Sequence, residues 1–145
     1  MARKRQTRLP LNPRAGSAAR RFVESFRQNL DPESFERLRL LVSELVNNSM
    51  KHSGRPEGDP IVLTVELDNR QVRAEVVDGG AGGDVLRTSP EARGESGWGL
   101  FLVDRLADTW GYSGEGPTRV WFTLPTHSGR TFGPRWPENS QADSA

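Results

Sequence analysis

The chain has 145 residues, enough for one domain with a hydrophobic core and too few for two comfortable ones. It carries 20 basic and 19 acidic residues, so no strong overall field would draw it onto nucleic acid or an anionic membrane, and a small-molecule or protein partner is favoured. Cysteine is absent, and no membrane-spanning apolar run or secretory signal is recognisable, which predicts a cytoplasmic protein without disulfides.

The first segment is basic and polar, with four cationic side chains between Arg3 and Arg8. We interpret residues 1–5 as a solvated basic tail, because chain ends are disordered unless they are tied down; a nucleic-acid-binding arm is the alternative. Residues 6–11 are expected to form a short strand. We place the domain itself at residues 6–125.

Two helices are predicted next. Apolar residues recur at helical spacing from Ala18 to Phe26, which predicts a first helix that ends near Asn29. The stretch Asp31-Pro32-Glu33-Ser34 is typical of a helix start, with an N-cap aspartate and a proline in the first turn. A second helix therefore runs to about His52. Its predicted apolar face consists of Phe35, Leu38, Leu41, Val42, Leu45 and Val46.

Strict alternation of apolar and polar residues then predicts two strands, at 61–67 and 72–76, joined as a hairpin by the turn at Asp68. Residues 79–99 are rich in glycine and form a long loop, a third helix covers about 99–110, and a last strand covers 118–124. The order predicts an α+β fold: a two-layer sandwich of a mixed, mainly antiparallel sheet with its helices on one face.

Residues 126–145 are dominated by Gly, Pro, Ser, Asn and Gln, which predicts a flexible tail. Its two large aromatic residues, Phe132 and Trp136, could dock on the domain or on a partner. The sequence does not decide between these two possibilities.

Three polar residues of the second helix share one stripe, because Glu44, Asn48 and His52 are spaced four apart. The stripe borders the apolar face, so it is expected to line the rim of a cleft. A carboxylate and an amide oxygen one turn apart can bind a hydrated Mg²⁺, and Glu44 could also deprotonate an attacking hydroxyl or water. The alternative is an ordinary helix edge, with Glu44 in an ion pair and His52 as a C-terminal cap.

The acid at the end of the second strand of the hairpin is a stronger candidate for a ligand-binding residue. Alternation places Asp78 on the same face as Val72, Ala74 and Val76, where the core should be. A buried carboxylate needs a hydrogen-bond donor, and the exocyclic amine of adenine is one. The alternative is that Asp78 caps the glycine-rich turn that follows it.

Glycine pairs bracket the long loop at Gly80 and Gly82 and at Gly97 and Gly99. Glycine permits close approach of the backbone to a ligand, and a helix that begins near residue 97 offers free N–H groups to a phosphate. Such pairs are often only turns. Arginines at positions 87 and 93 could swing over a phosphate as part of a lid, or stay solvated.

Taken together, these segments resemble a known family. Glu44-x-x-x-Asn48, Asp78-x-Gly80-x-Gly82 and Gly97-x-Gly99-Leu100 are similar to the N, G1 and G2 boxes of the GHKL ATP-binding domains, which share the Bergerat or histidine-kinase-like ATPase fold. Within that family, the chain most resembles the stand-alone anti-sigma-factor serine/threonine kinases of the RsbW and SpoIIAB kind. The resemblance covers about residues 6–124.

The resemblance implies ATP and Mg²⁺ as cofactors and a role for each matching position. Glu44 would be the catalytic base, Asn48 the Mg²⁺ ligand, and Asp78 the residue that holds adenine. The other nucleotide-binding positions would be His52, Gly80, Gly82, Gly97, Gly99, Leu100 and Thr118, the last assisting Asp78 through a water.

Two functions follow. The first is a protein kinase that phosphorylates a serine of an anti-sigma-factor antagonist and sequesters a sigma factor; the resemblance also suggests a homodimer. The second is a nucleotide-dependent binding switch without phosphotransfer. Direct binding of nucleic acid or membrane is not expected, because the net charge is near zero.

Overall fold

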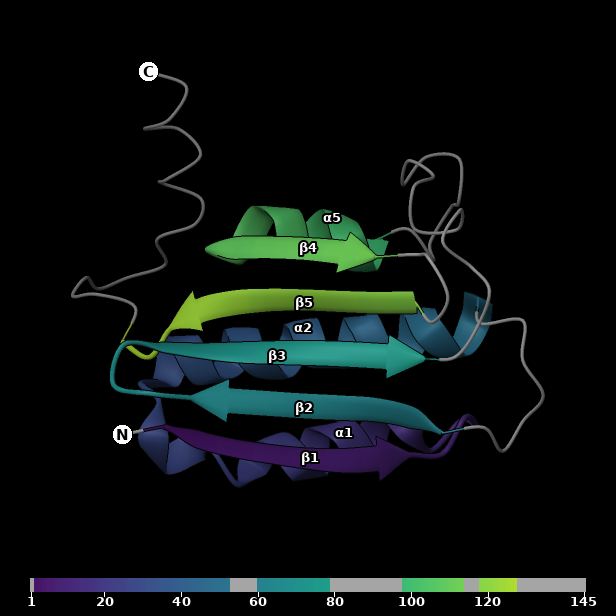
Figure 1. Cartoon of the computed structure of the whole chain (residues 1–145), viewed down its shortest axis with the longest axis horizontal. Coiled ribbons are helices and arrows are strands. Elements are labelled where there is room, and N and C mark those ends of the chain that lie inside the picture. Colours follow the sequence, from purple (N-terminus) through teal and green to yellow (C-terminus); the bar gives the residue numbers. More distant parts are fainter. Residues whose placement is uncertain (1, 53–59, 79–97, 114–117, 128–145) are drawn as a thin grey trace, which may run out of the picture.

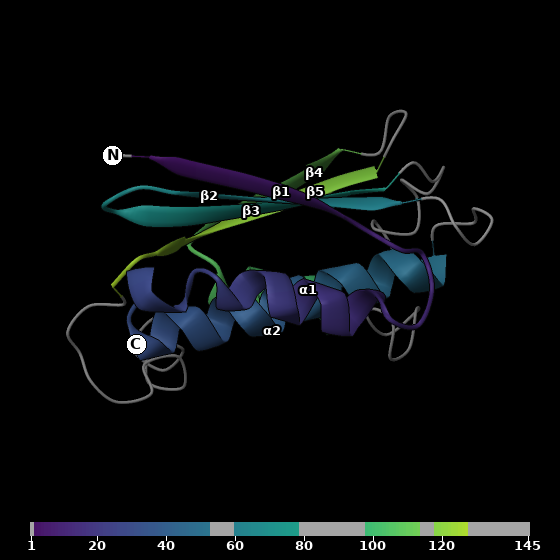
Figure 2. The same ribbon diagram turned by 90° about the horizontal axis from the view of Figure 1, so that it is seen from below.

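The computed structural model describes residues 2–52, 60–78, 98–113 and 118–127. These residues form two layers, with a sheet on one side and helices on the other (Figures 1 and 2). The elements are β1 (Arg3–Leu9), α1 (Ala15–Glu24), the 3₁₀ helix η1 (Arg27–Asn29), α2 (Pro32–His52), β2 (Ile61–Leu67), β3 (Gln71–Asp78), α5 (Trp98–Leu106), β4 (Thr109–Ser113) and β5 (Thr118–Pro125). The predicted two-layer α+β sandwich is confirmed.

The sheet has the strand order β1-β2-β3-β5-β4, and each neighbouring pair is antiparallel. The predicted hairpin is β2–β3, whose turn is held by Asp68: its Oδ1 accepts the backbone N–H groups of Arg70 at 2.7 Å and Gln71 at 2.9 Å. The last strand, β5, inserts between β3 and β4, so the end of β3 comes to lie beside the start of β5.

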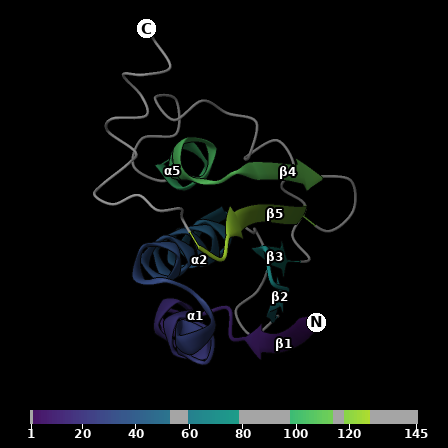
Figure 3. The same cartoon turned by 90° about the vertical axis from the view of Figure 1, so that its left-hand side faces the viewer.

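The core lies between the sheet and the helices. Every residue of the predicted apolar face of α2 is buried, and so is the alternating set on β2 and β3. The helices α1, α2 and α5 all lie on this one side of the sheet (Figure 3). The side chain of Asn47 on α2 packs directly against the backbone of α1 at Gly16, where a Cβ would lie 2.9 Å from Oδ1 of Asn47.

The N-terminus of α2 is fixed to the end of β5. The predicted N-cap is confirmed, since Asp31 Oδ1 accepts the backbone N–H of Ser34 at 2.8 Å. The Ser34 hydroxyl donates to the carbonyl of Pro125 at 2.7 Å, and the Asp31 N–H donates to the carbonyl of Thr126 at 3.0 Å. Thr126 is buried and bonds back to the β2–β3 turn at Asn69, so the packed structure reaches one residue beyond the predicted domain end.

The interpretation of residues 1–5 as a solvated tail is wrong for Arg3 to Arg5, because β1 begins at Arg3 and pairs along its length with β2. The guanidinium of Arg3 lies 5.5 Å from the ring centre of Phe26, and that of Arg5 lies 5.7 Å from the ring centre of Phe22. Strand pairing and contacts between cations and aromatic rings therefore order this basic segment. The alternation signal is weak there because most side chains of this edge strand are exposed.

Two helix boundaries also differ from the prediction. The first helix ends at Glu24, and a separate 3₁₀ turn covers Arg27–Asn29. The predicted helix over 99–110 is shorter, since α5 spans Trp98–Leu106, and the residues after it form the unpredicted strand β4. The side-chain hydroxyls of Thr109 and Thr123 lie 2.7 Å apart across the β4–β5 pair. Strand pairing with β5, a long-range interaction, thus overrides the helical spacing at Trp110.

Candidate nucleotide-binding site

The end of the sheet brings Asp78 and Thr118 together. Asp78 is the last residue of β3, Thr118 is the first residue of β5, and the two are direct partners in the antiparallel register. Directly opposed residues have their Cβ atoms about 5 Å apart and point to the same face. Asp78 is 4% exposed and shares its face with the buried Val72, Ala74 and Val76, so the predicted inward orientation of its carboxylate is confirmed.

The Thr118 hydroxyl is a buried polar atom whose hydrogen bonding is incomplete. The residue is 7% exposed, and within the described part of the chain its Oγ1 has no hydrogen-bond partner. A buried hydroxyl in this situation costs on the order of 1–3 kcal/mol. A buried hydroxyl without a partner is understandable at a ligand site, because a bound ligand can supply the missing hydrogen bond. Thr118 and Asp78 therefore fit a ligand that carries both donors and acceptors, as adenine does.

The helix α2 carries Asn48 to the same end of the sheet. Because Ser34 is bonded at the end of β5, the helix runs back along the strands toward the start of β5 (Figures 1 and 2). From Ser34 to Asn48 the helix advances by 14 residue steps, about 21 Å. From Pro125 back to Thr118 the strand advances by seven residue steps, about 24 Å. Asn48, which is 5% exposed, thus comes level with Asp78 and Thr118.

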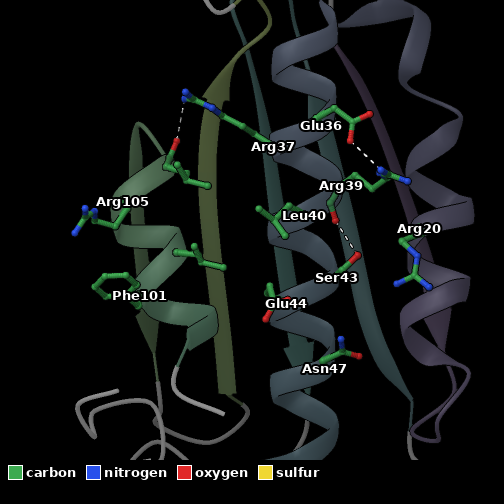
Figure 4. A pocket seen from close by; sticks show the side chains of 12 residues that line it. Arg20, Glu36, Arg37, Arg39, Leu40, Ser43, Glu44, Asn47, Phe101 and Arg105 are labelled. Atoms are coloured by element: carbon green, nitrogen blue, oxygen red, sulfur yellow. Dashed lines mark hydrogen bonds and ion pairs between the residues drawn. The ribbon is translucent and has the colours of Figure 1, made fainter. Parts of the chain in front are cut away.

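Glu44 lies one turn before Asn48 on α2 and is partly buried. It lines a groove of about 750 Å³ between α2 and α5, together with Ser43 and Asn47 (Figure 4). Sequence reasoning expected a cleft between helix and sheet and missed this groove on the outer side of the helices. The available signal was Leu40, an apolar residue outside the predicted apolar face of α2.

The remaining predicted site residues are only partly described. His52 is the last residue of α2, and Gly99 and Leu100 belong to the first turn of α5. For these three residues the structure describes only the backbone. The helix predicted to begin near Gly97 does begin at Trp98. Gly80, Gly82 and Gly97, with the loop arginines at 87 and 93, lie outside the described residues, so the phosphate-binding prediction stays a prediction.

No group of three or more acidic, histidine or cysteine side chains in the described ranges could form a metal site. Asn48 therefore remains the predicted ligand for Mg²⁺, and a site of this kind would rest on one amide and on phosphate oxygens. Nor is any helix of the described residues long and apolar enough to cross a bilayer.

A two-layer sandwich of this topology, with a buried acid at the end of its sheet and an amide one helical layer above, is the arrangement expected of a GHKL-type nucleotide-binding domain. Comparison with known families agrees: the family described as the histidine kinase-like ATPase domain matches residues 9–124. The chain belongs to this family, and membership implies ATP binding. Within the family it is of the RsbW and SpoIIAB type.

Two relatives support this assignment. The anti-sigma F factor of Clostridium acetobutylicum is 30% identical over 101 residues, which cover 63% of this chain and 71% of that protein. The crystal structure of the RsbU and RsbW domains of a Mycobacterium tuberculosis protein matches with a TM-score of 0.66 and 20% identity, covering 84% of this chain. The match covers 32% of that longer chain, and at this identity it shows the fold alone.

Proposed function

We propose that the protein is an ATP-dependent serine/threonine protein kinase of the anti-sigma-factor type, which phosphorylates an anti-sigma-factor antagonist and sequesters a sigma factor. The observation that carries the proposal is the meeting of Asp78, Thr118 and the second half of α2 at one end of the sheet. The relation to an anti-sigma F factor supports the choice of partners. We also propose a cytoplasmic location and a homodimer.

The proposed roles follow from the chemistry of each side chain. The Asp78 carboxylate accepts a hydrogen bond from the exocyclic amine of adenine, and the buried Thr118 hydroxyl gains a partner beside it. The Asn48 amide oxygen serves as a Mg²⁺ ligand. The Glu44 carboxylate accepts the proton of the serine hydroxyl that attacks. When bound, ATP would supply the phosphoryl group and Mg²⁺ would neutralise the charge that develops on it.

The other proposed nucleotide contacts are those of the family boxes: His52, Gly80, Gly82, Gly97, Gly99 and Leu100. Among them, α5 begins at Trp98, so the backbone N–H groups of its first turn are available in the region proposed for phosphate.

The second candidate is a nucleotide-dependent switch that binds a partner without phosphotransfer. It is favoured by the position of Glu44, which lines the groove between α2 and α5, whereas Asn48 is buried one turn later. An acid placed in this way can organise solvent or contact a partner without acting as a base.

Nucleotide binding is tested by calorimetry with ATP and Mg²⁺ on the parent protein and Asp78→Asn. The substitution keeps the size of the side chain but replaces an acceptor oxygen by a donor facing the adenine amine, so we expect affinity to fall by about tenfold or more. The matched control is Asp68→Asn in the β2–β3 turn, at the other end of β3 from Asp78. This variant should bind ATP as tightly as the parent protein. Unchanged affinity in a folded Asp78→Asn protein would remove the site assignment.

Phosphotransfer is tested by incubating the protein with labelled ATP and purified anti-sigma-factor antagonists from the same host. Glu44→Gln should retain ATP binding and lose transfer by roughly 100-fold or more, because general-base catalysis contributes that much. Glu24→Gln, an exposed acid at the end of α1 that does not line the groove, is the control and should transfer normally. A parent protein that binds ATP and transfers nothing would favour the switch.

A further inference from the structure

The groove between α2 and α5 has an apolar floor. It is lined by Leu40 of α2 and by Phe101, Leu102 and Leu106 of α5, and it opens on the side of the helices that faces away from the sheet (Figure 4). Leu40 is 40% exposed. Among the described residues, it is the one large hydrophobic residue that is classed as exposed. Exposed apolar surface gathered in a concave site is typical of a place where a partner binds.

The rim of the groove is mainly cationic. Four arginines line it against two glutamates, and they come from three helices: Arg20 from α1, Arg37 and Arg39 from α2, and Arg105 from α5. Two of these charges are compensated, since Arg37 bonds Glu33 at 2.8 Å and Arg39 bonds Glu36 at 2.9 Å.

The other two arginines stand on opposite sides of the groove. Within the described residues, neither Arg20 nor Arg105 forms an ion pair with a carboxylate. The guanidinium of Arg105 lies 5.1 Å from the ring centre of Phe101, at the edge of the apolar floor. Arg20 and Arg105 are both exposed, so each can pair with an acidic group of a partner at little desolvation cost.

The length of the groove sets the size of the occupant. Its lining along α2 extends from Glu36 to Asn47, an advance of 11 residue steps that spans about 16 Å, or three turns. A partner helix laid along the groove would place apolar residues from successive turns on the floor.

We propose that this groove binds an amphipathic helix of a protein partner, with the apolar face of that helix on Leu40 and Phe101 and with acidic residues along its edges facing Arg20 and Arg105. A second copy of this chain is a poorer occupant, because the same arginines would face one another across the interface. An RNA or DNA strand is also a poorer occupant, because its phosphates require a broad basic face and two of the four arginines are already paired with glutamates. The inference rests on the proposed function in one respect, because Glu44, the proposed base, lines the same groove; peptide binding is measured without nucleotide, so it can succeed where phosphotransfer fails.

The test uses the full chain and two fluorescent helical peptides of about 18 residues, long enough to hold helical structure. Both carry the same leucine face, and one has glutamate edges while the other has lysine edges. We expect the acidic peptide to bind at least about tenfold more tightly at low salt. Leu40→Asp and Arg105→Glu should each weaken it by about tenfold, whereas the control Arg70→Glu, which changes the same charge on the exposed β2–β3 turn, should not.

A charge swap separates recognition from misfolding. Arg105→Glu should gain affinity for the lysine peptide while it loses affinity for the acidic one, and a misfolded variant would lose both. Equal binding of the two peptides by the parent, or unchanged binding by Leu40→Asp, would overturn the proposal. Sedimentation provides a further test, because a dimer of the parent that Leu40→Asp dissociates would assign the groove to a second copy instead.

Discussion

The buried hydroxyl of Thr118 leads to a prediction in which stability and ligand binding change in opposite directions. Thr118→Val replaces the hydroxyl by a methyl group of the same shape, and valine is well suited to a strand. Since Oγ1 is buried without a hydrogen-bond partner in the described structure, its removal relieves a cost of about 1–3 kcal/mol. We therefore expect the free protein to gain about 1–2 kcal/mol in its free energy of unfolding.

The same substitution should weaken nucleotide binding, because the hydroxyl is expected to complete its hydrogen bonding only beside bound adenine. Loss of a hydrogen bond of this kind costs about 1 kcal/mol, which raises the Kd for ATP roughly fivefold. The stabilisation that saturating ATP and Mg²⁺ give to the folded state should shrink by about the same 1 kcal/mol.

The assay is urea unfolding with and without ATP and Mg²⁺, together with calorimetric titration of the nucleotide. Thr123→Val is the matched control, since Thr123 is buried on the same strand but its hydroxyl lies 2.7 Å from that of Thr109. That control should lose about 1 kcal/mol of stability and bind nucleotide normally. If Thr118→Val behaves like Thr123→Val, the hydroxyl has an ordinary structural role and the reasoning is refuted.

Three further predictions concern the fold. Asp31→Ala removes the N-cap of α2 and should lower the free energy of unfolding by about 1 kcal/mol in urea titrations. Gly111→Ala puts a Cβ 2.9 Å from the Trp121 ring, so the ring must move; we expect a loss of about 1–3 kcal/mol and altered tryptophan fluorescence, and a protein as stable as the parent would contradict this. Backbone hydrogen bonds from Gln71 and Arg70 hold the pKa of Asp68 below its ordinary value. Its folded-state pKa thus lies below the unfolded one, so the parent should be more stable than Asp68→Asn above about pH 4 and lose that advantage as the pH falls further; a difference independent of pH would be evidence against it.

The elements that local sequence determines were predictable. The second helix follows from the Asp31 cap and an unbroken apolar stripe, both properties of neighbouring residues, and its bounds agree with the structure. The β2–β3 hairpin follows from alternation on either side of Asp68. The inward orientation of Asp78 follows from the same alternation, because its face is shared with three apolar residues.

The elements that depend on distant partners were not predictable. Strand β1 is mostly exposed and basic, so it shows little alternation, and pairing with β2 is what orders it from Arg3 onward. Strand β4 follows α5 so closely that its Trp110 continues the helical spacing, and only pairing with β5 makes it a strand. The position of Thr118 opposite Asp78 likewise requires that β5 insert between β3 and β4, which no local pattern specifies.

The candidate site depends on the match in length between α2 and β5. The helix is fixed at Ser34 to the far end of β5. Asn48 then reaches the level of Thr118, because 14 residue steps of helix and seven residue steps of strand cover nearly the same distance, about 21 and 24 Å. The helix also presents Glu44 to the outer groove and Asn48 to the interior one turn later. A partner in that groove would contact the same helix that borders the candidate nucleotide site, with Glu44 and Asn48 one turn apart.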